Sequence, residues 1–210
     1  MEVSISKQQL AALPAAQFQG TITVIDDPES VEIAVSRLRE SDLIGFDTET
    51  RPSFKKGQIY HVALLQLSSD SECFLFRLNK IGMPETLKKL LEDKEILKVG
   101  LSIHDDFRNL HKKFDFEPEG FIELQQYATQ WNITDKSLSK LFGILFGKRI
   151  SKSQRLSNWE AEQLAEAQQN YAALDALACV KIYRHLKAGF FNPEESPYRI
   201  DVKEEEERGI

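Results

Sequence analysis

The sequence predicts an α/β protein in which one mixed sheet of five to six strands is flanked by helices. Short apolar runs separated by turn residues dominate the first half of the chain, which is typical of neighbouring strands. Farther along, two more such runs alternate with segments whose apolar residues recur every three or four positions, which indicates amphipathic helices. We expect these elements to form one domain over residues 21–191.

The strands of the first half are predicted at 21–25, 43–50, 62–67 and 73–76. β-branched residues fill the first of these runs. Asp27 as a cap and Pro28 at the first helical position then predict a helix that ends near Ser41. The polar turn 68–71 is so short that the two strands beside it are expected to pair antiparallel.

The second half is predicted to contain helices at 84–92, 104–114, 138–146 and 157–187, with strands at 95–100 and 120–124 and a helix directly after the last strand. Gly147 is a typical residue to close the third of these helices. Ser157 and Glu160 form a capping-box pattern, from which the long last helix is expected to begin.

Two terminal segments lie outside the predicted domain. Residues 1–20 are treated as an N-terminal extension to which the sequence assigns no definite structure. Residues 192–210 contain Pro193, Pro197 and the acidic run 204–207, so we expect a mobile acidic tail.

The composition is that of an ordinary globular protein, with 41% hydrophobic and 29% charged residues. A net charge of −6 does not suggest nucleic-acid binding, although a local basic surface can override the overall sign. Cys73 and Cys179 lie in apolar stretches and are expected to be buried thiols. Because the chain shows neither a signal peptide nor an apolar run of transmembrane length, we expect a cytoplasmic protein without a membrane partner.

The stretch 43–50 ends in two carboxylates, Asp47 and Glu49, which follow a buried apolar run. Residues two apart on a strand point to the same side. Two like charges near a core repel each other and resist desolvation, and a divalent cation would neutralise both. A strand end that reaches solvent is the alternative explanation for this pair taken alone.

Tyr171 and Asp175 are four residues apart on the last predicted helix and therefore share a face. Their neighbours are mostly alanine and leucine, and no basic residue lies three or four positions from Asp175. These surroundings favour the interpretation of Asp175 as a cation ligand over the alternative, a partly exposed aspartate at the margin of the helix.

Two adjacent acids, Asp105 and Asp106, stand at the start of a helix that follows a strand ending at Gly100. Acids at this place are favoured by the helix dipole in any case. The chemistry of the residues leaves open which of the two is functional.

Together these pieces resemble the DEDD superfamily of 3′→5′ exonucleases, and most of all the Werner-syndrome-type exonuclease domain and ribonuclease D. The DxE motif of that family is similar to Asp47-Thr48-Glu49, and its YxxxD motif is similar to Tyr171 to Asp175. The family register of the second motif falls on Asp106. The tyrosine assigns the DEDDy branch. The resemblance extends over about residues 21–189 and implies a ribonuclease-H-like fold.

The resemblance also implies the chemistry. It predicts a metal-dependent 3′→5′ exonuclease that hydrolyses phosphodiester bonds and releases 5′-mononucleotides with two divalent cations, Mg²⁺ or Mn²⁺. By analogy Asp47 bridges the cations, Glu49 and Asp175 hold the one beside the nucleophile, and Asp106 acts on the other. Tyr171 would orient the attacking water, since a phenol is a poor base at neutral pH.

The expected partner is a nucleic acid with a free 3′ end, DNA or RNA. Candidate substrate contacts are Thr48, Arg51, His104, Lys148, Arg149 and Arg155, together with Lys55, Lys56 and Lys152 in the same loops. For each loop charge, simple exposure to solvent is the alternative. A non-catalytic nucleic-acid-binding or scaffold module that keeps the fold is the alternative function.

Overall fold

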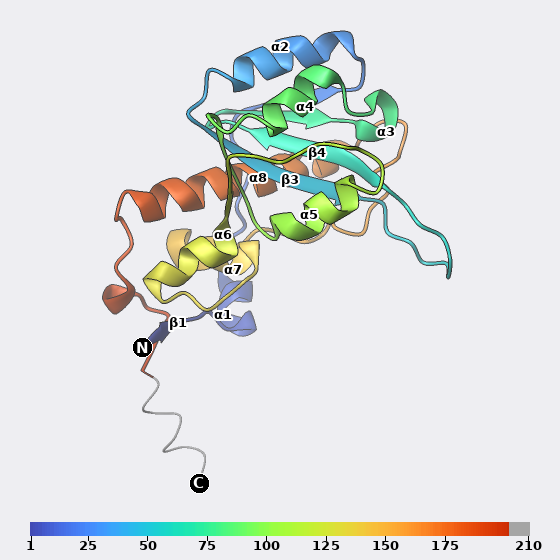
Figure 1. The fold of residues 1–210 in the computed structure, drawn as a ribbon. Coiled ribbons are helices and arrows are strands. Elements are labelled where there is room, and N and C mark those ends of the chain that lie inside the picture. Colours follow the sequence, from blue (N-terminus) through green and yellow to red (C-terminus); the bar gives the residue numbers. More distant parts are fainter. Residues whose placement is uncertain (202–210) are drawn as a thin grey trace.

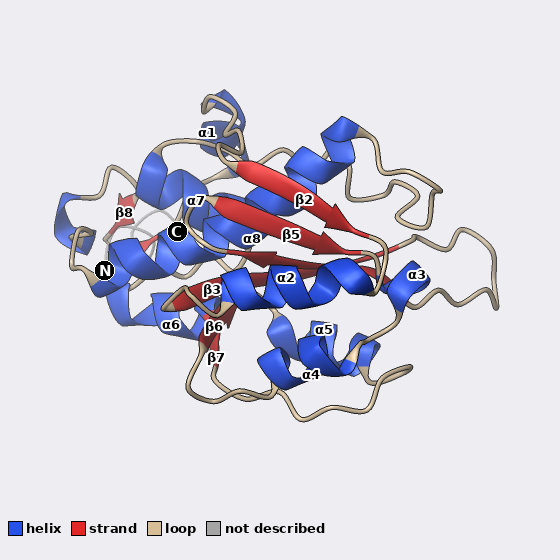
Figure 2. Ribbon diagram, turned by 90° about the horizontal axis from the view of Figure 1, so that it is seen from above, coloured by secondary structure: helices blue, strands red, loops and turns tan. Residues whose placement is uncertain are grey.

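The computed structural model describes residues 1–201 and contains a central six-stranded sheet (Figure 1). Its strands are β2 (Thr21–Ile25), β3 (Leu43–Thr50), β4 (Val62–Ser68), β5 (Glu72–Phe76), β6 (Leu97–Gly100) and β7 (Phe121–Glu123). Their order across the sheet is β2-β5-β4-β3-β6-β7 (Figure 2). β4 is antiparallel to both neighbours and the other pairs are parallel, which confirms the predicted mixed sheet and the antiparallel β4–β5 pair.

Helices cover both faces of the sheet. They are α2 (Glu29–Leu38), α3 (Leu78–Ile81), α4 (Glu85–Leu91), α5 (Ile103–Leu110), α6 (Leu124–Tyr127), α7 (Leu138–Phe146) and α8 (Glu166–Lys187), with a 3₁₀ turn at Ala128–Trp131. One buried apolar cluster joins α2, α4 and α5 to one face, and α8 crosses the other face against β3, β4 and β5 (Figure 1). No helix within residues 1–201 combines the length and apolar character that a bilayer crossing requires.

The predicted long helix begins later than expected. α8 starts at Glu166, and residues 157–165 form a loop, so the prediction of a helix from Ser157 is wrong. The loop is fixed by tertiary contacts: Trp159 is fully buried, and the Gln168 side chain donates to Ser157 Oγ at 3.0 Å. A helix through these positions could not provide both contacts.

The two terminal segments pair with each other and pack against the domain. β1 (Glu2–Val3) pairs antiparallel with β8 (Arg199–Ile200), and α1 (Lys7–Ala12) follows β1. Val3 is completely buried in the cluster that also includes α7 and α8. A 3₁₀ turn (Pro193–Glu195) precedes β8. That the tail from residue 192 is mobile stays a prediction, and its acidic run 204–207 lies outside the described residues.

The close approach of α8 to β3 depends on Gly45. A Cβ atom built on Gly45 would lie 2.0 Å from the carbonyl oxygen of Ala176, so only a residue without a side chain fits here. Other small residues of α8, among them Ala172 and Ala173, are buried against the same face of the sheet. This packing brings the side chains of α8 to the end of β3 that carries Asp47.

Gly45→Ala is expected to lower the free energy of unfolding by about 3 kcal/mol, because a clash with backbone cannot be relieved by rotating a side chain. Gly143→Ala is the matched control, since its new Cβ would meet the flexible Leu10 Cδ1 at 2.8 Å. Gly143 lies inside α7, where alanine is the better helix former by about 1 kcal/mol, so a small net change is expected. Urea unfolding of both variants measures the difference, and equal losses would contradict this account.

Candidate active site

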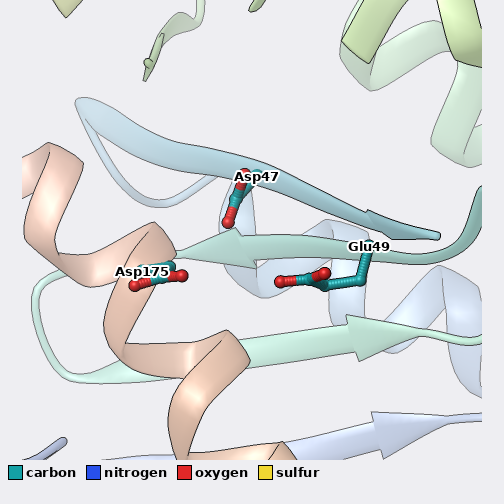
Figure 3. Close-up of side chains that lie close together, drawn as sticks. All are labelled: Asp47, Glu49 and Asp175. Atoms are coloured by element: carbon teal, nitrogen blue, oxygen red, sulfur yellow. The ribbon is translucent and has the colours of Figure 1, made fainter. Parts of the chain in front are cut away.

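Three carboxylates converge where α8 crosses the end of β3 (Figure 3). Asp47 and Glu49 come from β3 and Asp175 from α8, and one oxygen of each lies within 4.8 Å of the others. The two β3 residues share a face because side chains alternate along a strand. The structure thus brings together three of the four acids that the sequence predicted as metal ligands.

The cluster is largely removed from solvent, and its carboxylates repel one another; Asp47 is half-buried. Glu49 is 8% and Asp175 7% exposed. Burial, followed by the charge of Asp175, raises the pKa of Asp47 well above its usual value. Burial and the charge of Asp47 raise the pKa of Glu49 to about 10, and burial raises the pKa of Asp175 to about 7. Carboxylate oxygens that lie this close together fit a hard divalent ion.

Asp106, and not Asp105, faces the cluster. The Thr48 hydroxyl of β3 donates a hydrogen bond to the Asp106 carboxylate. Burial and the charge of Asp47 raise the pKa of Asp106 to about 8. Asp105 is 70% exposed and pairs with Arg108 at 3.0 Å. Asp106 does not belong to the group of three whose oxygens lie within 4.8 Å.

The orientation of α5 comes from a contact that the sequence did not reveal. The Glu123 carboxylate at the end of β7 accepts hydrogen bonds from the backbone N–H groups of Ser102 and Ile103, at 2.9 and 2.8 Å. Ser102 adopts a left-handed conformation with φ of 63°, which turns the chain sharply from β6 into α5. Through this turn the long-range contact determines which acid of α5 points toward β3.

Tyr171 lies one helical turn before Asp175 and borders the same space. A cavity of about 270 Å³ there is lined by both residues and by Ser102, Lys152 and Arg155. Burial and the neighbouring Asp175 raise the pKa of Tyr171, so its hydroxyl keeps its proton. Two positive charges oppose part of the rise in the carboxylate pKa values. Lys152 acts in this way on Asp175, and Arg155 acts on Glu49.

The other predicted substrate contacts lie in different surroundings. Arg51 pairs with Glu160 at 3.4 Å and stacks on the Tyr60 ring at 4.7 Å. Arg149 donates from Nε to the Leu13 carbonyl oxygen at 3.1 Å, so it binds the N-terminal segment. The side chains of His104, Lys55, Lys56 and Lys148 are exposed, as are those of Lys152 and Arg155 at the cavity.

Gln66 is a polar residue at the site that the sequence reading did not single out. It lies on β4 directly opposite Asp47 and is completely buried. Within residues 1–201 neither its amide nitrogen nor its amide oxygen has a hydrogen-bond partner, which commonly costs about 1–3 kcal/mol. A signal was present, because Gln66 is the only polar residue in the run 62–67.

The mixed sheet and its acidic cluster define an α/β nuclease of ribonuclease-H-like fold. A family model for the 3′–5′ exonuclease domain matches residues 22–189, and the chain belongs to this family. Such domains act on nucleic acids, and this chain carries a 3′–5′ exonuclease domain. The predicted family and fold are thereby confirmed.

Two curated relatives support this assignment. The bifunctional 3′–5′ exonuclease/ATP-dependent helicase WRN of Mus musculus is 37% identical over 190 residues, covering 83% of this chain and 13% of that protein. A 3′–5′ exonuclease of Arabidopsis thaliana is 32% identical over 199 residues, covering 87% of this chain and 69% of that protein. The chain thus spans only a small part of the mouse relative.

Solved structures show the same fold at lower identity. The exonuclease domain of Aedes aegypti Nibbler superposes with a TM-score of 0.72 at 21% identity, covering 86% of this chain and 97% of that one. Escherichia coli RNase D superposes with a TM-score of 0.70 at 21% identity, covering 82% of this chain and 47% of that one. The predicted likeness to ribonuclease D therefore extends to the fold.

The raised pKa values predict that the cation-free protein loses stability as pH rises. The Asp175 carboxyl has a pKa of about 3.8 when unfolded and about 7 when folded, so between these values the folded state holds the extra proton. The free energy of unfolding should therefore fall across this window, by at most about 1.4 kcal/mol per pH unit for each such proton. Urea unfolding in EDTA at several pH values measures this slope.

Asp175→Asn should reduce the slope, and a saturating divalent cation should restore stability at the upper end of the window. A wild-type stability in EDTA that stays flat or increases as pH rises from about 4 to about 7 would contradict the pKa assignment.

Proposed function

We propose that this domain hydrolyses phosphodiester bonds from the 3′ end of a nucleic-acid strand and releases 5′-mononucleotides, with two divalent cations, Mg²⁺ or Mn²⁺. The observation that carries the proposal is the group of three carboxylates, Asp47, Glu49 and Asp175, whose oxygens lie within 4.8 Å of one another. An isolated buried cluster of this kind is unfavourable, and a pair of bound cations would offset its charge.

Asp47, Glu49 and Asp175 would hold the cations. When bound, such ions lower the pKa of a coordinated water and stabilise the negative charge on the leaving oxygen. Asp106 lies farther out and reaches the site beside Thr48, which supports a contact through water. Its hydrogen bond with Thr48 holds the carboxylate toward Asp47 and away from solvent.

Tyr171 positions the attacking water. Because burial and Asp175 raise its pKa, its hydroxyl stays protonated at neutral pH and cannot act as the base. A protonated hydroxyl that lines the cavity can donate or accept a hydrogen bond and so fix the orientation of a water. This geometry supports the positioning role that the family resemblance implies.

Lys152 and Arg155 bind the phosphates of the substrate strand. Both line the cavity that holds Tyr171 and Asp175, and both are close enough to lower the pKa of a carboxylate of the cluster. Cationic side chains beside a carboxylate cluster allow an anionic backbone to approach it. DNA and RNA share this backbone, so both are candidate substrates.

Asp47→Asn and Asp175→Asn are each expected to reduce metal-dependent degradation at least about 100-fold, because each removes a charged ligand from the cluster. Asp105→Asn is the matched control, since its side chain is exposed and pairs with Arg108. A strand of DNA and one of RNA, each labelled at the 5′ end, report shortening from the 3′ end with Mg²⁺ or Mn²⁺. Binding without hydrolysis by the wild type would indicate the non-catalytic alternative.

Arg155→Gln is expected to raise KM for an oligonucleotide about 5- to 20-fold with a smaller effect on kcat, because it removes a phosphate contact. Lys187→Gln removes the same charge at the far end of α8 and serves as the control. The difference between the two variants should diminish at high salt. Equal KM values for both variants at low salt would exclude Arg155 as a substrate contact.

A further inference from the structure

Gln66 is placed beside the carboxylate cluster by the register of the sheet. In the antiparallel pair of β3 and β4, Asp47 is opposite Gln66, and Glu49 is opposite Leu64. Directly opposite residues of such a pair project to the same face, with Cβ atoms about 4.5–5.5 Å apart. Figure 3 shows that this is the face where Asp47 and Glu49 turn toward Asp175.

Much of the rest of that face is apolar. The buried cluster under α8 includes Leu64, Leu75, Ala173 and Ala176. Within residues 1–201 neither polar atom of the Gln66 amide has a hydrogen-bond partner, and the side chain is 0% exposed. The residue directly opposite Gln66 in the register of β3 and β4 is Asp47, whose carboxylate can accept a hydrogen bond.

We propose that Gln66 is a positioning residue for Asp47. Within residues 1–201 this amide makes no hydrogen bond. In the cation-bound protein its Nε2–H group donates a hydrogen bond to the Asp47 carboxylate and keeps that carboxylate turned toward Glu49 and Asp175. An amide that donates to an ionised carboxylate makes a charge-assisted bond, which is stronger than one between neutral groups. This inference rests on the proposed function, in which Asp47 binds the cations.

Packing alone predicts a different behaviour. If Gln66 only fills space, an apolar side chain of the same length would serve as well, and the cluster would bind cations with unchanged affinity. If Gln66 orients Asp47, the same replacement weakens cation binding, since residues that hold a ligand in place commonly contribute 10- to 100-fold to affinity.

Gln66→Met tests the two possibilities, with Leu64→Met as the matched control on the same face and opposite Glu49. The measurement is the Kd for Mn²⁺ by isothermal titration, together with thermal unfolding in EDTA. We expect Gln66→Met to raise the Kd at least about 10-fold without losing stability, and Leu64→Met to leave the Kd within about twofold of the wild type. An equal, small change in both variants would overturn the proposal.

The same variant should affect kcat and KM differently. Gln66→Met is expected to lower kcat at fixed Mn²⁺ concentration and to leave KM for the oligonucleotide unchanged, because the amide does not touch the strand. A rise in KM with constant kcat would contradict a role through Asp47.

The wild-type protein provides a test that does not depend on a variant folding. The side-chain amide signal of Gln66 in a ¹H–¹⁵N spectrum should shift when Mg²⁺ is added, and its exchange with solvent should slow. A signal that does not move at saturating Mg²⁺ would overturn the proposal. Cation binding without hydrolysis would defeat only the proposed function, whereas hydrolysis with a normal Mn²⁺ affinity in Gln66→Met would defeat only this inference.

Discussion

The mutual repulsion of three carboxylates, two buried and one half-buried, is the constraint on which the rest of the site depends. Asp47, Glu49 and Asp175 keep their oxygens within 4.8 Å of one another, and burial raises the pKa of each. Two alternate strand positions and one helix position must be held rigidly to maintain such an arrangement. The repulsion among these carboxylates favours a divalent cation between them, so the structure and the proposed chemistry follow from one arrangement of charge.

Rigidity comes from close packing of backbone against backbone. Gly45 lets α8 approach β3 so nearly that a methyl group would overlap the Ala176 carbonyl oxygen. Asp175 precedes Ala176 on the helix, so the position of this ligand is set by the helix–sheet contact itself. On the opposite strand Gln66 offers a buried amide to the same region. Sheet register and helix approach thus determine the site together.

Local periodicity was sufficient to predict much of the site. A strand places Asp47 and Glu49 on one face, and a helix does the same for Tyr171 and Asp175. The choice between the two acids of α5 was beyond local reasoning, because it depends on a contact of Glu123 with the start of that helix. The start of α8 was mispredicted for a similar reason, since burial of Trp159 turns the preceding loop away from a helical path.

The most direct test of the central claim is to locate the cation. A crystal of the wild-type protein soaked in Mn²⁺ should give an anomalous difference peak bounded by Asp47, Glu49 and Asp175, with carboxylate oxygens about 2.0–2.4 Å away. A second, weaker peak toward Asp106 would fit the two-cation arrangement. Absence of any peak at the cluster at saturating Mn²⁺, with all three side chains ordered, would contradict the account.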